Sequence, residues 1–401
     1  MSAPEWTPPG GRMTPRGGKD APAGPRFGQR RSLFGAAAGT LGAAAAAGSA
    51  EAARPGARAG SFVQVDDFPG PAGADDTAAI VWALAEAVRL GAAVVFSGRV
   101  YRISETIDLP TGVQLLGMGA VSGAEPGGLT GTVLQRVRDI VMLRAKGKAF
   151  ERGGPMRHSI MIRGLLLHGD DHPSDLVQLI SAARITIEDC FFIAAKGRLL
   201  LLWEVFDSRI VNTDFEWGGV AGGRVPMVEL RSGSGLEYTN QIHFTGCRME
   251  SYPGTALAMT GSNTNEIFFT NCKLESLLPT CVDPAIAMGG ANVVRFGGVQ
   301  VTSRGNAGAP MRALVSARGC SFVTGDLYFE HLDYDGKASR LAAYLDLSGS
   351  QGVDLRLVIY DGATRLPLEA CVAFDRSNAK ACSVRGLLKR GAEVVAHTWS
   401  A

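Results

Sequence analysis

The sequence is poor in charged residues, in aromatic residues and in paired cysteines. Charged residues make up 19% of the 401-residue chain and aromatic residues 7%. The sparse charges do not gather into the basic face that a nucleic-acid partner requires. The one Ala-rich apolar stretch, residues 35–48, is shorter than the roughly 20 residues that cross a bilayer. The sequence therefore argues against a nucleic-acid-binding protein and predicts no membrane span.

The cysteines do not form the patterns of metal or disulfide sites. No two of them are separated by only two or three residues, which argues against a zinc site. Their odd number and wide spacing also argue against a disulfide framework. We therefore expect most of them to be buried free thiols that pack as small apolar side chains; they are Cys190, Cys247, Cys272, Cys281, Cys320, Cys371 and Cys382.

The sequence does contain a repeated phrase. It reads NQIHFTGCRMES in residues 240–251 and NEIFFTNCKLES in residues 265–276. The copies lie 25 residues apart (267 minus 242, from Ile242 to Ile267). Each copy has the pattern of two short strands around a tight turn. A repeat period of this length indicates a solenoid, and 52 Gly and 19 Pro residues supply its many turns.

The same pattern runs through most of the chain as an apolar residue, a turn residue two positions later and a second apolar residue five positions later. The apolar pairs are Ile162/Leu167, Ile187/Phe192, Ile210/Phe215, Phe244/Met249, Phe269/Leu274, Phe296/Val301 and Phe322/Leu327. The turn residues are of types that tolerate the left-handed conformation or bond their own backbone: Gly164, Asp189, Asn212, Gly246, Asn271 and Gly298. The long step from Ile210 to Phe244 predicts a longer loop at residues 218–226.

A third apolar strand is expected between successive copies of the phrase. These strands are residues 177–180, 199–203, 227–230, 256–259, 285–288, 313–315, 344–347 and 371–374. Three short strands per coil, in roughly 9–10 coils, predict a prism with continuous apolar rows inside and a cap at each end. Residues 386–401 are the expected C-terminal cap.

A row of carboxylates follows from the same register. Glu216, Glu250 and Glu275 each come directly after a second apolar residue of the repeat, so they are expected to stack on the outside. Repulsion between them raises their pKa values. Arg248 and Lys273, two residues earlier in their coils, offset that repulsion, and a solvated structural row is the favoured interpretation.

The N-terminal part of the folded region predicts one amphipathic helix over residues 78–90. Asp75, Asp76 and Thr77 offer N-cap side chains, and Gly91 ends the helix. The predicted core face carries Val81, Leu84, Ala85 and Val88. We expect the helix to cover the open end of the solenoid.

Residues 1–53 differ from the rest of the chain. They contain six basic and three acidic residues, a net charge of +3, whereas the whole chain carries +2; residues 54–401 therefore carry about −1. Arg30-Arg31 precedes a weakly apolar stretch and Ala50-Glu51-Ala52. This resembles a twin-arginine export signal with a disordered preface, which implies an extracellular or cell-envelope protein. Residues 54–61 are the expected linker and 62–401 the folded domain.

Four short motifs open the folded region: VDDF at 65–68, DDTAAI at 75–80, VFSGRVYRIS at 95–104 and IDLPTGVQLLGMG at 107–119. Together they resemble the opening of the pectate-lyase-like right-handed parallel β-helix superfamily, which includes phage tailspikes and epimerases. The resemblance implies an all-β fold of about 9–10 three-stranded coils with an N-terminal capping helix. It also implies that the outward face of the third strand is a glycan groove, and it allows a homotrimer. It carries no catalytic residue.

Alternation along the third strand directs Glu229 and Arg231 outward, beside a floor of small residues in the next coils (Ala258, Thr260, Ala287 and Gly289). Glu204 and Trp203 end the preceding third strand. Glycoside hydrolysis needs two carboxylates about 5–10 Å apart. Glu229 and Glu204 are therefore the candidate catalytic pair, with Arg231 and Trp203 as candidate substrate contacts; the alternative is that the charged residues are solvated surface groups.

The densest titratable cluster is His168-Gly-Asp-Asp-His172. Asp170 and Asp171 are further catalytic candidates, and His172 is a candidate substrate contact. The cluster can also hold a divalent cation such as Ca²⁺. The alternative is a polar turn before Pro173.

The predicted function is a secreted polysaccharide lyase or glycoside hydrolase. A non-catalytic carbohydrate-binding or structural β-helix is the first alternative, mildly favoured by the Ala and Gly residues at groove positions. A sugar epimerase or intramolecular transferase on the same fold is the second. These functional predictions rest on likeness of fold.

Overall fold

The computed structural model describes residues 62–70, 74–122, 129–148, 156–233, 238–278, 281–304, 310–332, 340–362, 364, 366–375 and 382–400. All of them belong to one compact unit. The predicted export signal and linker, residues 1–53 and 54–61, lie outside the described residues.

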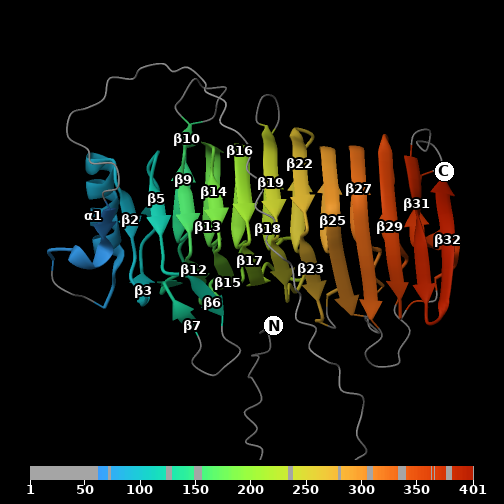
Figure 1. Ribbon diagram of the computed structural model, residues 1–401, viewed down its shortest axis with the longest axis horizontal. Helices are drawn as coiled ribbons and strands as arrows, with labels where there is room; N and C mark the ends of the chain where they lie inside the picture. The colour runs from blue at the N-terminus through green and yellow to red at the C-terminus, as the bar shows by residue number, and fades with distance from the viewer. Residues whose placement is uncertain are drawn as a thin grey trace, which may run out of the picture. The chain divides into compact units, whose positions relative to one another are not determined.

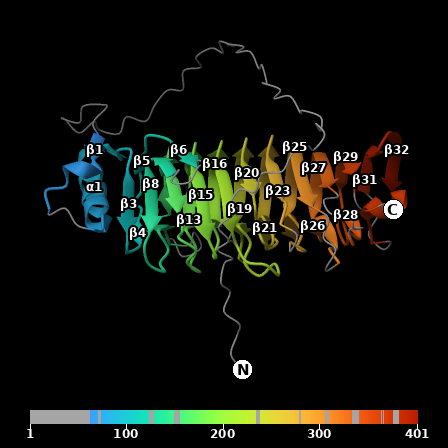
Figure 2. The ribbon, with the colours of Figure 1, turned by 90° about the horizontal axis from the view of Figure 1, so that it is seen from below.

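The chain winds into about 10 turns of a parallel β-helix, as the repeat predicts. Its strands stack in three ladders, here named A, B and C, in which each strand pairs in parallel with its counterpart in the next coil. Figure 1 shows this stack, with α1 at one end and the antiparallel pair β31 and β32 at the other. Figure 2 shows the same strands from below.

Ladder A contains the first strand of the repeated phrase. Its members are β1 (Phe62–Gln64), β2 (Ala93–Val95), β5 (Gln114–Leu116), β11 (Met161–Arg163), β14 (Thr186–Glu188), the end of β16 (Leu200–Val211), β19 (Thr239–Thr245), β22 (Thr264–Thr270) and the first parts of β25 (Asn292–Arg304), β27 (Ser321–Leu332), β29 (Val353–Asp361) and β31 (Cys382–Arg390).

Ladder B contains the second strand. Its members are β3 (Val100–Ile103), β8 (Val133–Arg136), β12 (Leu166–His168), β15 (Phe191–Ala195), β17 (Asp214–Gly218), β20 (Arg248–Glu250), β23 (Lys273–Ser276) and the later parts of β25, β27, β29 and β31.

Ladder C contains the predicted third strand, and its observed strands match the predicted ones closely. They are β4 (Ile107–Asp108), β9 (Leu143–Lys146), β13 (Val177–Ala183), the start of β16, β18 (Val228–Arg231), β21 (Leu257–Thr260), β24 (Ile286–Gly289), β26 (Ala313–Arg318), β28 (Ala343–Asp346) and β30 (Val372–Ala373). The remaining elements are β6 (Ala120–Ser122) with β7 (Leu129–Gly131), β10 (Arg157–His158), β32 (Glu393–Ser400), α1 (Thr77–Leu90) and two 3₁₀ turns, η1 (Val65–Asp67) and η3 (Leu368–Cys371).

The tight turns between ladders A and B are confirmed. All six predicted turn residues have positive φ, from +45° at Asn212 to +71° at Gly298. Asn and Gly alternate along this edge, because a Cβ on Gly246 would lie 2.7 Å from Oδ1 of Asn212 in the preceding coil. The Asn side chain thus fills the space that the following Gly leaves open.

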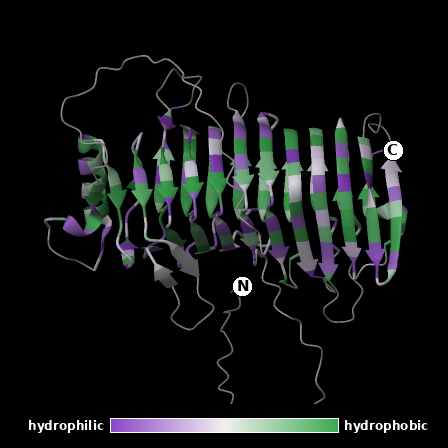
Figure 3. Ribbon diagram, in the orientation of Figure 1, coloured by the Kyte–Doolittle hydropathy of each residue, from purple (hydrophilic) through white to green (hydrophobic). Residues whose placement is uncertain are grey.

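Inward side chains form continuous apolar rows, and Figure 3 shows apolar and polar residues alternating along many strands. Phe244, Phe269 and Phe296 stack inside ladder A, with ring centroids 5.0 and 5.5 Å apart. The seven cysteines are free and buried, as predicted. Burial raises the pKa of the Cys190 thiol to about 12, which leaves it unreactive at neutral pH.

The predicted buried face of the helix is wrong except at Leu84, which is buried. Val81 is 49% exposed and Val88 54% exposed, and Ala85 is exposed as well. The buried residues are Thr77, Ala79, Ile80, Ala83, Leu84 and Ala87. The helix packs against β1, β2 and β4 through these mostly small side chains, which allow the closest approach to the strands. Whether α1 caps the solenoid stays a prediction.

The seventh pair of the repeat, Phe322/Leu327, is also wrong at its first residue. Phe322 is 60% exposed, and Gly325 pairs with Phe296 in its place. The register shifts between Phe296 and Val299, so this coil lacks the tight turn and β27 runs through both ladders. A Cβ on Gly325 would lie 1.8 Å from the Phe296 carbonyl oxygen, so the close coil contact there requires glycine.

Candidate functional site

The outward positions of ladder C form two rows along the axis of the β-helix. The first row is Gln178, Leu201, Glu229, Ala258, Ala287, Ser316 and Asp346. The second is Ile180, Trp203, Arg231, Thr260, Gly289 and Arg318. The alternation in the sequence predicts these positions. We name the small residues Ala258, Thr260, Ala287, Gly289 and Ser316 the trough.

One end of the trough holds an ion-paired triad that spans three coils. Arg198 Nε donates to Glu229 Oε2 at 2.5 Å, and its Nη1 lies 3.1 Å from Asp175 Oδ1. Thr260 Oγ1 donates to the other Glu229 oxygen at 3.1 Å. Glu229 is only 6% exposed and Asp175 8%. Glu229 is therefore not the solvated surface charge of the alternative interpretation.

The triad balances two carboxylates with one guanidinium. Burial alone lowers the pKa of Arg198, but the attraction of Asp175 and Glu229 outweighs it and raises the pKa above its usual value. Arg198 is therefore unsuited to act as a base.

A flat aromatic and cationic surface borders the triad. The Arg231 guanidinium lies 5.1 Å from the Trp203 ring centroid, and the two residues are register partners in adjacent strands. Arg231 is exposed and Trp203 half-buried. A ring face with an adjacent donor group suits a sugar, which has one apolar face and hydroxyl groups at its edge.

The far end of the trough holds a second cationic cluster. Arg312 Nε and Arg318 Nε donate to Asp346 Oδ2 at 2.9 and 3.1 Å. Asp346 lies four coils from Glu229 in the same row, a span of about 19 Å at the usual strand spacing. Between the two clusters the outward side chains are small, and a Cβ added to Gly289 meets no atom within 4 Å.

Glu204 does not join Glu229. It lies at the bend of β16 with φ +56° and is 2% exposed, and Ser181 Oγ donates to its carboxylate. Glu229 pairs with Leu201, three residues before Glu204. Three strand residues extend about 10 Å, and the two carboxylates bind different partners. The structure pairs Glu229 with Asp175 instead.

The turn at residues 168–172 is built around a buried arginine. The Arg136 guanidinium donates to the carbonyl oxygens of Gly169, His172 and Ser174 at 2.9 to 3.0 Å. Asp170 and Asp171 have positive φ and are exposed, and their side chains have no place in the triad at Glu229. Burial lowers the pKa of His168, which Asp170 and Asp171 partly oppose. These contacts explain the cluster as a stabilised turn.

The carboxylate row on ladder B is confirmed. Glu216, Glu250 and Glu275 are register partners in successive coils. Burial raises the pKa of Glu216, and the neighbouring charges of Glu250 and Asp214 raise it further. Arg248 lies 2.6 Å from Glu250, and Lys273 lies 3.5 Å from it, so the predicted offset is present.

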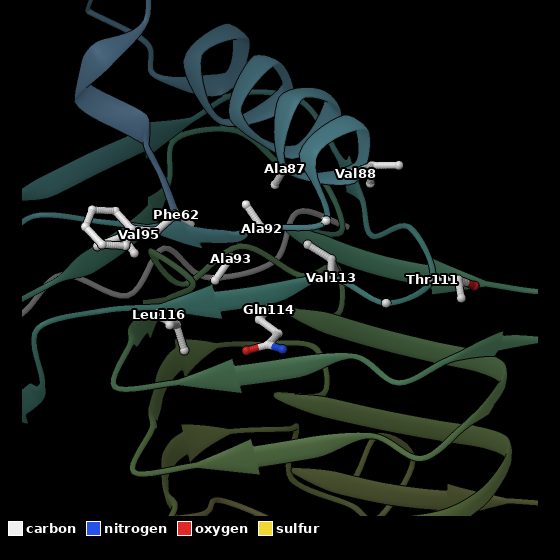
Figure 4. A pocket seen from close by; sticks show the side chains of 12 residues that line it. Phe62, Ala87, Val88, Ala92, Ala93, Val95, Thr111, Val113, Gln114 and Leu116 are labelled. Carbon is white, nitrogen blue, oxygen red and sulfur yellow. The ribbon is translucent and has the colours of Figure 1, made fainter. Parts of the chain in front are cut away.

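Two hollows lie on ladder A rather than on ladder C. One, of about 510 Å³, lies between the end of α1 and strands β2 and β5. Figure 4 shows its mostly apolar lining, with Thr111 and Gln114 as labelled polar side chains. The other, of about 600 Å³, lies over β14, β16 and β19 and has a polar lining.

A buried row on ladder B contains the residue types of a serine hydrolase triad. Ser303 Oγ and His331 Nδ1 are 2.6 Å apart, and Asp361 is the register partner of His331 in the next coil. Ser303 is 5% exposed and His331 1%, so no substrate reaches them. The row is therefore part of the interior.

Within the described ranges, no three His, Cys, Asp or Glu side chains are grouped as a metal ion would need. The predicted cation at residues 168–172 thus has no such group of ligands there. None of the helices in the described part of the chain is long and apolar enough to cross a membrane.

The sequence pattern did not identify Asp175 or Arg198 as candidate site residues. They lie 23 residues apart, and Arg198 lies 31 residues before Glu229. A 23-residue step also separates Ile187 from Ile210 in the repeat (210 minus 187). This equal spacing, directly before two third strands, is the signal that would have placed the two residues on adjacent coils.

The fold defines the class: a parallel β-helix of about 10 turns. Among solved structures, the chain is similar to ORF18 of Geobacillus virus E2, with a TM-score of 0.61 and 15% identity over 83% of this chain and 62% of that one. It is also similar to the gp42 tailspike of Acinetobacter phage vb_AbaP_AS12, with a TM-score of 0.50 and 10% identity over 85% of this chain and 64% of that one. A DFA-IIIase of Arthrobacter chlorophenolicus A6 has a TM-score of 0.48 and 11% identity over 79% of this chain and 93% of that one.

The first two likenesses show the fold alone, because the identities are low. The chain spans less than two thirds of the first two proteins, 62% and 64% of their lengths. No protein-family model matches the chain, and no curated protein sequence matches it.

Proposed function

We propose that the protein binds a polysaccharide laid along the trough on ladder C. The observation that carries the proposal is the row of small residues Ala258, Ala287 and Gly289 between two clusters of arginine and carboxylate groups. The coil spacing of about 4.8 Å is close to the length of one sugar unit in an extended chain. The trough would then hold about four units, with Trp203 and Arg231 contacting one end.

The resemblance of residues 65–119 to the pectate-lyase-like superfamily supports a glycan as the ligand. The contacts of Glu229 explain why binding, rather than catalysis, is the first function that we propose. Arg198 and Thr260 occupy both oxygens of Glu229, so neither oxygen is free for the hydrogen bond that a general acid makes to its substrate. The exposed Arg231 and the partly exposed Arg198 instead provide donors for sugar hydroxyl groups.

Cleavage of the bound polysaccharide, by hydrolysis or elimination, is the second candidate. The presence of two carboxylates, Glu229 and Asp175, on one guanidinium favours it, since glycosidases use a pair of carboxylates. Glu229 remains the leading catalytic candidate. Glu204 and the two aspartates at 170 and 171 remain untested candidates with other partners in the fold.

Binding is tested by electrophoresis of the protein in gels that contain a panel of polysaccharides. Retardation by at least one polymer is expected, and Trp203→Ala should weaken it about tenfold because the ring face is lost. Trp217→Ala is the matched control, because Trp217 is 49% exposed but lies on ladder B. Equal effects of the two substitutions would contradict binding at the trough.

Cleavage is tested by assays for new reducing ends and for the absorbance of unsaturated products. If wild-type protein produces either, Glu229→Gln should abolish the activity while the protein still binds. Full activity in Glu229→Gln would show that Glu229 is not a catalytic residue. If the wild-type protein binds a polysaccharide but forms no product, the non-catalytic function is supported.

Export and assembly are part of the proposal. The twin-arginine-like signal at residues 30–52 supports an extracellular or envelope location. Fusion of residues 1–53 to a reporter protein should direct its export, and Arg30→Lys with Arg31→Lys should stop it. The homotrimer that the resemblance allows is tested by light scattering of the purified chain.

A further inference from the structure

The outward face of ladder A carries two stacked rings between two arginines. Arg209, His243, Phe268 and Arg295 are successive register partners in β16, β19, β22 and β25. The His243 and Phe268 rings have centroids 4.6 Å apart and an interplanar angle of 14°. We name these four residues the ring platform.

The ring platform is not needed to fill the core. The interior of the same strands is already filled by the stacked rings of Phe244, Phe269 and Phe296, which alternate in the sequence with the outward residues. His243 is exposed and Phe268 is half-buried. The simplest explanation for two aromatic rings that face solvent on neighbouring coils is therefore that they bind a partner outside the core.

A polar hollow borders the ring platform. Its volume is about 600 Å³, and its lining includes Arg184, Thr186, Asp207, Arg209, Gln241 and His243. Arg209 Nε donates to Thr186 Oγ1 at 3.2 Å, which orients one guanidinium along the face. Within the described residues, no carboxylate forms an ion pair with Arg184 or Arg295, and both arginines are exposed. These two cationic groups are thus available to an anion from outside.

We propose that the ring platform is a second glycan-binding surface, which takes a sugar chain bearing carboxylate or sulfate groups. The ring faces of His243 and Phe268 pack against the apolar faces of sugar rings, and the arginine forks on either side bind the anionic groups. From Arg209 to Arg295 is three coils, about 14 Å, which matches about three sugar units.

The ring platform and the trough lie on different ladders of the β-helix. The inference rests on the proposed function only for the class of ligand, a glycan. The residues of the ring platform differ from those of the trough, so binding at each site can be tested separately by substitution.

The test is a binding measurement on the full chain with three probes: polygalacturonate for carboxylates, heparin for sulfates and dextran as a neutral polymer. Phe268→Ala should weaken binding of at least one anionic probe about tenfold, and Arg295→Ala should weaken it severalfold. Neither substitution should weaken dextran binding or lower the melting temperature to a matching extent. Phe268→Leu keeps the apolar volume but removes the ring, so it should reproduce the loss even if Phe268→Ala folds poorly.

Phe322→Ala is the matched control, because Phe322 is also an exposed aromatic on ladder A but has no stacked partner among the described rings. It should bind as wild type does. The proposal is overturned if Phe268→Leu and Phe322→Ala behave alike, or if wild-type protein binds neither anionic probe. It is also overturned if Phe268→Leu dissociates an oligomer in sedimentation, because the rings would then be an interface between copies.

Trp203→Ala in the same assay distinguishes the two sites. If Trp203→Ala loses binding but Phe268→Leu does not, the trough is the binding site and the ring platform is not. If Phe268→Leu loses binding but Trp203→Ala does not, the ring platform is the binding site and the trough is not.

Discussion

Removal of Arg198 is the sharpest perturbation of the trough. Its side chain is 21% exposed, and those of Asp175 and Glu229 are 9% and 8% exposed. Arg198→Ala leaves two enclosed carboxylates without their cation. Breaking a buried ion pair costs about 3–5 kcal/mol. Because Arg198 still reaches water, we expect a loss near the lower limit, about 3 kcal/mol of unfolding free energy at pH 8.

The loss should be smaller when one of the two carboxylates is replaced by a neutral group. Glu229→Gln in the Arg198→Ala background leaves only one enclosed carboxylate without its cation, so it should recover part of the loss.

Urea denaturation followed by far-ultraviolet circular dichroism at pH 8 measures these differences. Arg231→Ala is the control, because Arg231 is exposed and its guanidinium lies over the Trp203 ring; we expect a loss of about 1 kcal/mol or less. An Arg198→Ala loss below that of Arg231→Ala, or no recovery when Glu229→Gln is added, would refute the description of a buried, charge-balanced triad.

Two further predictions concern stability outside the trough. Glu216→Gln should raise the free energy of unfolding at pH 8 by about 0.2–1 kcal/mol, because it removes one like-charge pair. The gain should vanish at low pH, because a carboxyl whose folded pKa is raised costs stability only where it is ionised; a gain that persists at pH 3 would contradict this cause. Tyr252→Phe should raise stability by about 1 kcal/mol, because the buried Tyr252 hydroxyl has no hydrogen-bond partner among the described residues. Tyr344→Phe is its control and should lose stability, since the Tyr344 hydroxyl lies 3.5 Å from Thr364 Oγ1; stabilisation in both variants would contradict the reasoning.

The coils and their turns are predictable because every coil must bury the same rows. An apolar residue, a turn residue and a second apolar residue recur at fixed spacing, and parallel pairing turns this spacing into register. The positive φ at Asn212 and Gly246 follows from residue type alone. The carboxylate row at Glu216, Glu250 and Glu275 follows from the same register.

The wrong predictions concern residues whose burial the repeat spacing does not determine. The helix sequence TAAIVWALAEAVRL is apolar on nearly every side, so periodicity cannot choose between the Ala79–Ala83 side and the Val81–Val88 side. Close packing on the strands chooses the small residues. Likewise, the step from Phe296 to its partner Gly325 is 29 residues (325 minus 296), whereas the repeat counts 26 residues to Phe322 (322 minus 296), so the repeat assigns the core position to Phe322.

The triad was beyond sequence reasoning for a geometric reason. Its three members come from three coils and are held together by an arginine that lies just before a strand, where side-chain direction is not fixed by alternation. The outward position of Glu229 is predictable, whereas its burial depends on which neighbours cover it. The same holds for Glu204, whose place at a bend with positive φ no alternation rule gives.

The central claim is that the trough on ladder C holds the polysaccharide, and Gly289→Trp tests it most directly. A Cβ at Gly289 meets no atom within 4 Å, so the indole should fill the trough without disturbing the fold. The measurement is the dissociation constant of the polysaccharide that wild type binds most tightly, with Gly289→Ala as the control of minimal size. The account predicts that Gly289→Trp loses binding at least tenfold while Gly289→Ala and the melting temperature stay unchanged. Wild-type affinity in a folded Gly289→Trp would contradict it.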